Sequence, residues 1–166
     1  GCFFYEKNNM NIQLDYDNYK QHLAADPGYP AFYQKIQRIV ADRQWVSMMS
    51  DAKWLTLQHA MRAWKSPPAY HAQLIIGHDI TADIQRFMQE IPAYLGDWNP
   101  VFEEGMPYFI NIEFLMIKPM LRKFQGALMD DEIYDQSDYF RTTLQKLNIP
   151  FEEENHCFTV YGYRSI

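Results

Sequence analysis

The sequence predicts an α+β fold in which N-terminal helices pack on a mostly antiparallel sheet, followed by a C-terminal helix and a terminal hairpin. Apolar residues recur at helical spacing through the first third of the chain, strand-like runs then alternate with helices without a βαβ repeat, and two strand-like runs close the chain. The 166 residues, 48% of them apolar, suffice for one core. We therefore expect a single domain over residues 15–166, preceded by an extension or tail over residues 1–14.

Five segments carry the apolar spacing of a helix, and the third is the clearest. In that segment Trp54, Leu57 and Met61 lie on one face, and Ser50 or Asp51 supplies an N-terminal cap. Pro or Gly residues follow most of the segments and end them. We expect helices at residues 17–26, 30–43, 50–64, 79–91 and 137–148.

Strands are expected where β-branched and aromatic residues form short runs bounded by turn residues. A long run from Tyr108 to Ile117 follows a turn, and a short strand through Phe102 precedes that turn. Residues 119–135 carry no clear pattern, and we expect a short helical turn that ends at Gly126, then irregular chain. The remaining strands are expected at residues 69–77 and on both sides of a turn at Asn155.

The charge of the chain argues against nucleic acid and for a basic partner. The formal net charge is −6, and many of the acids lie in the second half of the sequence. Such a surface repels phosphate backbones and attracts cationic proteins. We therefore expect a basic protein as the partner and no nucleic acid.

Two features of the sequence bear on its location. No apolar run reaches the roughly 18 residues of a membrane-spanning helix, so no membrane span is expected. The only two cysteines, Cys2 and Cys157, define no disulfide framework, which favours a reducing, cytoplasmic compartment. The Gly-Cys start is also similar to a lipoprotein cleavage site, so a periplasmic lipoprotein is the alternative.

Motifs for catalysis and metal binding are missing from the sequence. The five histidines form no HExxH motif, the chain contains no CxxC pair, and no phosphate-binding glycine motif occurs, so no metal and no cofactor are expected. Adjacent hairpin residues point to opposite sides, which makes Glu103 and Glu104 a poor catalytic pair and a candidate partner contact. Glu113 interrupts an apolar strand, where a buried carboxylate needs a partner or marks a site. Cys157 is expected to be a buried structural thiol.

Aromatic residues are more numerous than a core usually accommodates. The twelve Tyr residues need hydroxyl partners when they are buried, so some are expected at a surface that contacts another molecule. Trp98 lies between Asp97 and Asn99 and is expected at the surface. Trp54 and Trp64 lie on a helical stripe and are expected in the core.

Four stretches resemble a family of small uncharacterised bacterial domains. They are MSDAKWLTLQHAM, DW, EEGMPYFINIEFLMI and DYFRTTLQKLNIPFEEENHCFTVYGY, and the resemblance extends over residues 38–163. The family positions are occupied by Asp51, Lys53, Trp54, Glu113, Phe114, Leu115, Ile149, Pro150, Tyr161 and Gly162, with Phe114 where the family carries Trp. Small acidic proteins of this kind are similar to immunity proteins of bacterial toxin systems, which implies a protein partner.

The leading hypothesis is therefore a non-enzymatic protein-binding module, an immunity protein that neutralises a cognate bacterial toxin through an acidic and aromatic surface. Its rivals are a small enzyme with a site assembled from Glu113, His71 and Tyr161, and a homodimeric structural module. The residues expected to contact the partner are Glu103, Glu104, Asp130, Asp131, Glu152 and Glu153 for electrostatics, with Trp98 and Tyr108 as aromatic anchors.

Overall fold

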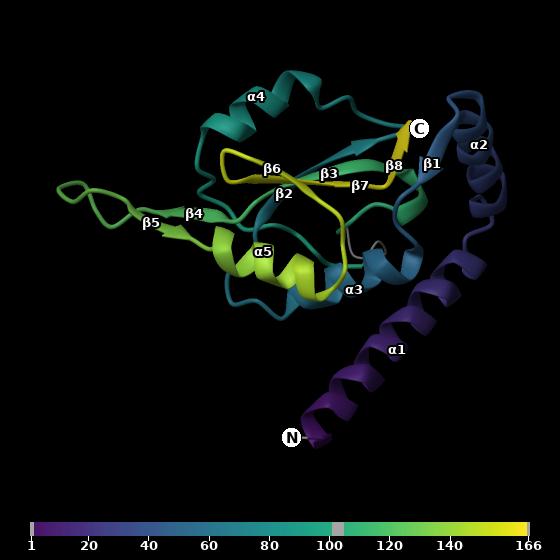
Figure 1. Ribbon diagram of the computed structural model, residues 1–166, viewed down its shortest axis with the longest axis horizontal. Coiled ribbons are helices and arrows are strands. Elements are labelled where there is room, and N and C mark those ends of the chain that lie inside the picture. The colour runs from purple at the N-terminus through teal and green to yellow at the C-terminus, as the bar shows by residue number, and fades with distance from the viewer. Residues whose placement is uncertain (1, 101–104, 166) are drawn as a thin grey trace.

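The computed structural model describes residues 2–100 and 105–165, with side chains from residue 12 onward, and has the expected α+β class (Figure 1). The helices are α1 (Cys2–Ala25), α2 (Tyr29–Asp42), α3 (Asp51–Arg62), α4 (Thr81–Gln89) and α5 (Ser137–Lys146). The strands are β1 (Trp45–Ser47), β2 (Ala69–Leu74), β3 (Ile112–Lys118), β4 (Met120–Lys123), β5 (Glu132–Asp135), β6 (Glu152–Glu154), β7 (Cys157–Tyr161) and β8 (Tyr163–Ser165).

An antiparallel sheet of order β2-β3-β7-β6 forms the centre of the fold. Side chains alternate between its faces, so Leu115 and Ile117 point to one side of β3 and Met116 to the other. Figure 1 shows α4 over one face of this sheet and α3 with α5 under the other. The α3 and α5 side of the core buries Trp54, Leu57, Met61, Phe140 and Leu144, and the α4 side buries Phe87 and Cys157.

Local signals explain the helices that the sequence predicts well. The Ser50 hydroxyl accepts a hydrogen bond from the Lys53 amide (3.2 Å) and caps α3, whose buried face includes Trp54 and Leu57 as expected. Asn148 follows α5 with a positive φ of 55°, a conformation that Asn tolerates at the end of a helix.

Helix α1 is longer than the sequence indicates, because it begins at Cys2 rather than near residue 17. It therefore runs across residue 14, where a tail was expected to meet the domain. Its later turns pack on the body: Asp15 lies 2.9 Å from His59 of α3, and the buried Tyr19 ring stacks on Phe109 at 4.5 Å.

The expected long strand from Tyr108 to Ile117 is wrong in its first half. Phe109–Asn111 form a 3-10 helix, and β3 starts at Ile112. The physical reason is the Asn111 side chain, which accepts a hydrogen bond from the Ile76 amide and donates one to its carbonyl, both at 2.9 Å. The expected short strand through Phe102 lies outside the described residues.

The expectation for residues 119–135 is also wrong, because they form a β-hairpin rather than a helical turn. Strand β4 pairs with β5 from Met120 opposite Asp135 to Lys123 opposite Glu132. Figure 1 shows this hairpin extending away from the body of the molecule. We call residues 120–135 the arm.

The C-terminal hairpin is confirmed, with β6 and β7 joined by a turn at Asn155 and His156. Both residues have positive φ, 50° and 61°, as a two-residue type I′ turn requires. Strand β8 then pairs with β1, a ribbon that the sequence did not indicate. Gly162 allows the chain to pass β3, because a Cβ there would lie 2.0 Å from the Ile112 carbonyl oxygen.

Candidate interaction surface

The tip of the arm exposes large apolar side chains to solvent. Phe124 is 77% exposed and Met129 64%, while Leu128 between them in sequence is fully exposed. Ile133 and Tyr134 on β5 are also exposed. Clustered apolar side chains of this size on the surface of a protein mark an interaction site, whereas single ones are common.

Acidic residues adjoin this apolar tip. Asp130 and Asp131, both expected at the partner surface, immediately follow Met129 and precede β5. Asp131 lies 3.5 Å from Arg122 of β4, and Glu132 accepts a 2.6 Å hydrogen bond from Gln125. The arm therefore combines an apolar tip with an excess of acids.

The sequence reasoning missed the apolar half of this surface. The stretch FQGALMDDE contains three large apolar residues and three acids around one Gly, with neither helical nor strand periodicity. The signal in the sequence was an apolar stretch beside consecutive acids that lacks the periodicity of a helix or a strand. Without that periodicity its apolar residues have no common face to bury, which indicates exposure.

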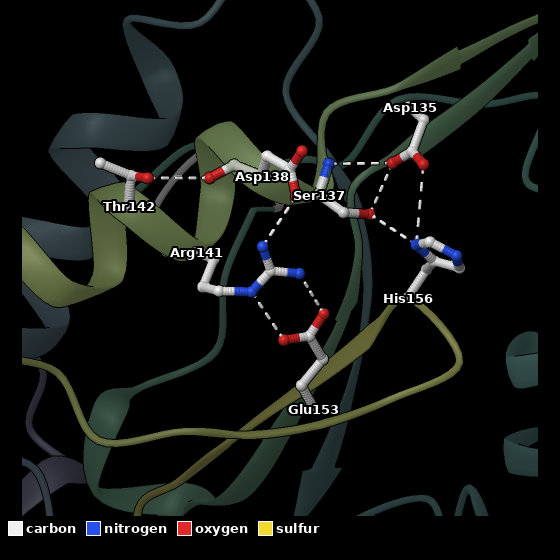
Figure 2. Close-up of polar contacts among 7 residues, drawn as sticks. All are labelled: Asp135, Ser137, Asp138, Arg141, Thr142, Glu153 and His156. Carbon is white, nitrogen blue, oxygen red and sulfur yellow. Dashed lines mark hydrogen bonds and ion pairs between the residues drawn. The ribbon is translucent and has the colours of Figure 1, made fainter.

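The base of the arm is fixed to α5 and to the β6–β7 turn (Figure 2). Asp135 accepts hydrogen bonds from the Ser137 amide (2.9 Å) and hydroxyl (2.5 Å), a local turn that leads into α5. His156 places its Nδ1 3.1 Å from the Ser137 hydroxyl and 3.6 Å from Asp135. Burial acts to raise the pKa of Asp135, but the hydrogen bonds from Ser137 and the charges of His156 and Arg141 outweigh it, so the pKa lies below its ordinary value.

These three side chains do not form a hydrolytic triad. In a triad the hydroxyl and the carboxylate use opposite nitrogens of the imidazole. Here Ser137 and Asp135 both lie against Nδ1 of His156, and the Ser137 hydroxyl donates to Asp135. Ser137 is also only 3% exposed, so the cluster acts as a structural support for the arm.

Two of the three acids of β6, Glu152 and Glu153, are paired with arginines within the chain. Glu153 binds Arg141 of α5 through both carboxylate oxygens, at 2.8 and 2.5 Å, and this pairing holds its pKa below the ordinary value (Figure 2). Glu152 lies 2.9 Å from Arg164 and accepts a 3.1 Å hydrogen bond from Tyr161. Both glutamates were expected to attract the partner. Because each is already paired with an arginine, it attracts a basic partner less strongly than Asp130, which has no such pair in the described part of the chain.

Trp98 is not the surface anchor that its polar neighbours in sequence suggested. It is 2% exposed, its indole N–H donates to the Pro68 carbonyl (2.9 Å), and its ring packs on Tyr70 at 4.7 Å. The hydrogen bond satisfies the polar end of the indole, which allows the whole ring to enter the core.

Tyr108 is half-buried and is engaged within the chain. Its hydroxyl donates to Asp26 (2.6 Å), and its ring lies 5.3 Å from the Tyr29 ring of α2. Burial, with a contribution from Asp26, raises the pKa of Tyr108 to about 12. This contact holds the α1–α2 connection, and the other expected contacts, Glu103 and Glu104, lie outside the described residues.

The residues of the rival enzyme site, Glu113, His71 and Tyr161, line three different depressions rather than one. Glu113 lines a depression of about 400 Å³ with Arg43, His71 lines another of about 420 Å³ with Tyr94, and Tyr161 lines a third. Glu113 is the extra residue of a β-bulge, because Gln73 pairs with Phe114 and Leu74 with Ile112. Burial raises the pKa of its carboxyl, partly offset by Arg43.

The remaining expectations concern the thiol, metals and membranes. Cys157 is buried as expected, and burial raises the pKa of its thiol to about 11. Among residues 2–100 and 105–165, no three His, Cys, Asp or Glu side chains are placed to hold a metal ion. The helices in this part of the chain include none with the length and apolar character to cross a membrane.

Together these features define an acidic α+β domain with an exposed apolar arm. The chain belongs to a family of unknown function (DUF6678), whose model matches residues 36–165. The matched range contains the central sheet, the arm and its base. No match to the chain was found among the curated proteins or among the solved structures.

Proposed function

We propose that this protein is a non-enzymatic binding module that neutralises a basic protein toxin by binding it through the arm. The observation that carries the proposal is the exposure of Phe124, Leu128 and Met129 directly beside Asp130 and Asp131. An apolar tip of this kind enters a pocket on a partner, and adjacent acids pair with Lys or Arg at the rim of that pocket.

The rest of the molecule supports this role. The net charge of −6 accelerates encounter with a basic partner. The contacts of Asp135 with Ser137 and His156 hold the arm on α5 and the β6–β7 turn, so its base is ordered before binding. Neutralisation by covering a toxin requires no catalytic group, which agrees with the places of Glu113, His71 and Tyr161 in three different depressions.

The test compares a tip variant with the wild-type protein against the product of the gene immediately upstream. The tip variant carries Phe124→Ser, Leu128→Ser and Met129→Ser. We expect it to bind at least about a hundredfold more weakly by isothermal titration calorimetry, because buried anchors dominate binding energy. We also expect cells that express the toxin to lose protection.

The matched control replaces exposed apolar residues outside the arm, with Leu14→Ser on α1 and Met48→Ser before α3. We expect this variant to bind and protect as the wild type does. A tip variant that binds normally, or a wild-type protein that neither binds nor protects, would show that the proposed function is wrong.

A further inference from the structure

We infer that the basic partner adds a β-strand to the free edge of β5. This inference rests on the proposed function and specifies how the arm holds its partner. It follows from the backbone geometry of the arm and from the charges on β5.

Strands β4 and β5 form a sheet of their own, so each has one outer edge. The outer edge of β4 is already in use, because the Arg122 amide donates to the Pro92 carbonyl at 2.8 Å. Since this amide points away from β5, Arg122 and its partner Ile133 form a non-hydrogen-bonded pair. Ile133 therefore also directs its N–H and C=O outward, on the other side of the arm.

The edge of β5 is open to solvent. All four of its residues are exposed, and it pairs only with β4 among the strands that the structure describes. An open edge with unpaired N–H and C=O groups is a template for an added strand. The backbone of Ile133 supplies the donor and the acceptor for this addition.

The side chains determine which strand can be added. Glu132 and Asp135 lie on β5, and Asp130 and Asp131 directly precede it. A second copy of β5 would bring like charges together, because antiparallel pairing about Ile133 sets Asp135 opposite Asp131 of the copy and parallel pairing sets each acid beside its own copy. A strand that places Lys or Arg beside Glu132 and a β-branched residue beside Ile133 is favoured instead, and Lys must alternate with the β-branched residue because successive side chains point to opposite faces.

The edge strand β6 offers a comparison within the same molecule. It also carries exposed acids, Glu152 to Glu154. Arg164 and Arg141 already neutralise Glu152 and Glu153. On the arm Asp131 and Asp135 also have a cationic neighbour, Arg122 at 3.5 Å and His156 at 3.6 Å, but no ion pair is formed by Asp130 or Glu132 among the described residues, so a basic strand gains more there. The geometry therefore favours β5 over β6.

The probe is a capped synthetic peptide in which Lys alternates with Val. We expect it to bind the wild-type protein and to slow hydrogen exchange of the Ile133 amide by at least about tenfold, as a new backbone hydrogen bond does. A peptide with Glu in place of each Lys should not bind. Protection of the β6 amides in place of Ile133, equal binding of the Glu peptide, or no binding of the Lys peptide would overturn the inference.

Two substitutions at one position separate the backbone from the side chain. Ile133→Pro removes the outward N–H and leaves the ladder with β4 intact, because residue 133 donates no bond to that ladder. Ile133→Ala removes most of the side chain and keeps the N–H. We expect the Pro variant to lose peptide binding by at least about tenfold and the Ala variant to lose far less.

The same Pro variant distinguishes failure of this inference from failure of the proposed function. If Ile133→Pro binds the toxin normally while the tip variant does not, strand addition is wrong and the binding role of the arm stands. If the tip variant also binds the toxin normally, the proposed function itself is wrong.

Discussion

Lys118 is a buried charged residue that binds the C-terminal end of helix α4. It is 3% exposed on β3, and its ammonium donates hydrogen bonds to the carbonyls of Phe87 (3.2 Å) and Met88 in the last turn of α4. The last carbonyls of a helix have no hydrogen-bond donor within the helix. Lys118 provides that donor for α4 from the central sheet. Burial lowers the pKa of this ammonium, which means that the folded state bears a cost for the charge.

Lys118→Met should reduce the free energy of unfolding by about 1–3 kcal/mol, because it leaves the carbonyl of the buried Phe87 and that of the half-buried Met88 without this donor. Urea denaturation followed by circular dichroism measures this loss. The exposed Lys65→Met is the control and should change stability by less than about 0.5 kcal/mol. Equal stability of the two variants would show that the contacts of Lys118 with α4 contribute nothing.

Glu113→Gln should change the pH dependence of stability. The folded state raises the pKa of Glu113, so the stability linked to its protonation is present below the ordinary glutamate pKa and is lost as pH rises through the folded value. Gln is neutral throughout, so the variant should match the wild type at acid pH. At neutral pH it should exceed the wild type by on the order of 0.5 kcal/mol, a small gain because solvent screens a half-exposed group.

The free energy of unfolding of both proteins, measured by denaturation from acidic to neutral pH, tests whether the variant gains stability as the pH rises. Glu154→Gln, at an exposed position of β6, is the control for the loss of one carboxylate. A Glu113→Gln variant that loses stability as the pH rises, relative to the wild type, would mean that Arg43 outweighs burial at this carboxyl.

At the scale of elements, the sequence predicts what local signals determine. Helix α3 follows from the Ser50 cap and a stripe of buried residues within one segment. The arm could not be predicted in this way, because β5 exposes both apolar and charged residues and so lacks a buried face. The 3-10 helix before β3 depends on Asn111 reaching Ile76, a contact between distant parts of the chain.

The candidate surface was predictable only where a local pattern in the sequence determines it. Clustering of acids is visible in sequence, which is how Asp130 and Asp131 were identified. The burial of Trp98 depends on the Pro68 carbonyl and the Tyr70 ring, which no local pattern reveals. The neutralisation of Glu153 depends equally on Arg141, which lies on a different element.

Shortening the arm should separate stability from binding. Lys123 and Glu132 are paired across the hairpin, so replacing residues 124–131 with Asn-Gly joins them by a two-residue turn. The free energy of unfolding should change by less than about 1 kcal/mol, because the removed side chains are largely exposed. Toxin binding, measured by calorimetry, should be lost. A large loss of stability would show that the tip supports the core.

At the scale of the whole molecule, charge should govern the rate of association. With a net charge of −6, the rate constant for binding the basic partner should fall by at least about tenfold between about 0.02 M and about 0.5 M NaCl. Stopped-flow fluorescence measures this rate. The tip variant should instead raise the dissociation rate, because its losses are short-range contacts. An association rate that does not respond to salt would contradict electrostatic attraction.

Cys157 provides a means of detecting partners that have not been identified. Its thiol is 2% exposed and has a pKa of about 11, so a thiol reagent reaches it only when the core opens. Any molecule that binds the folded chain reduces the population of open chains by the factor 1 + [L]/Kd. In a Cys2→Ser background, the slowing of this one reaction therefore reports the affinity of a candidate partner without a label on either molecule.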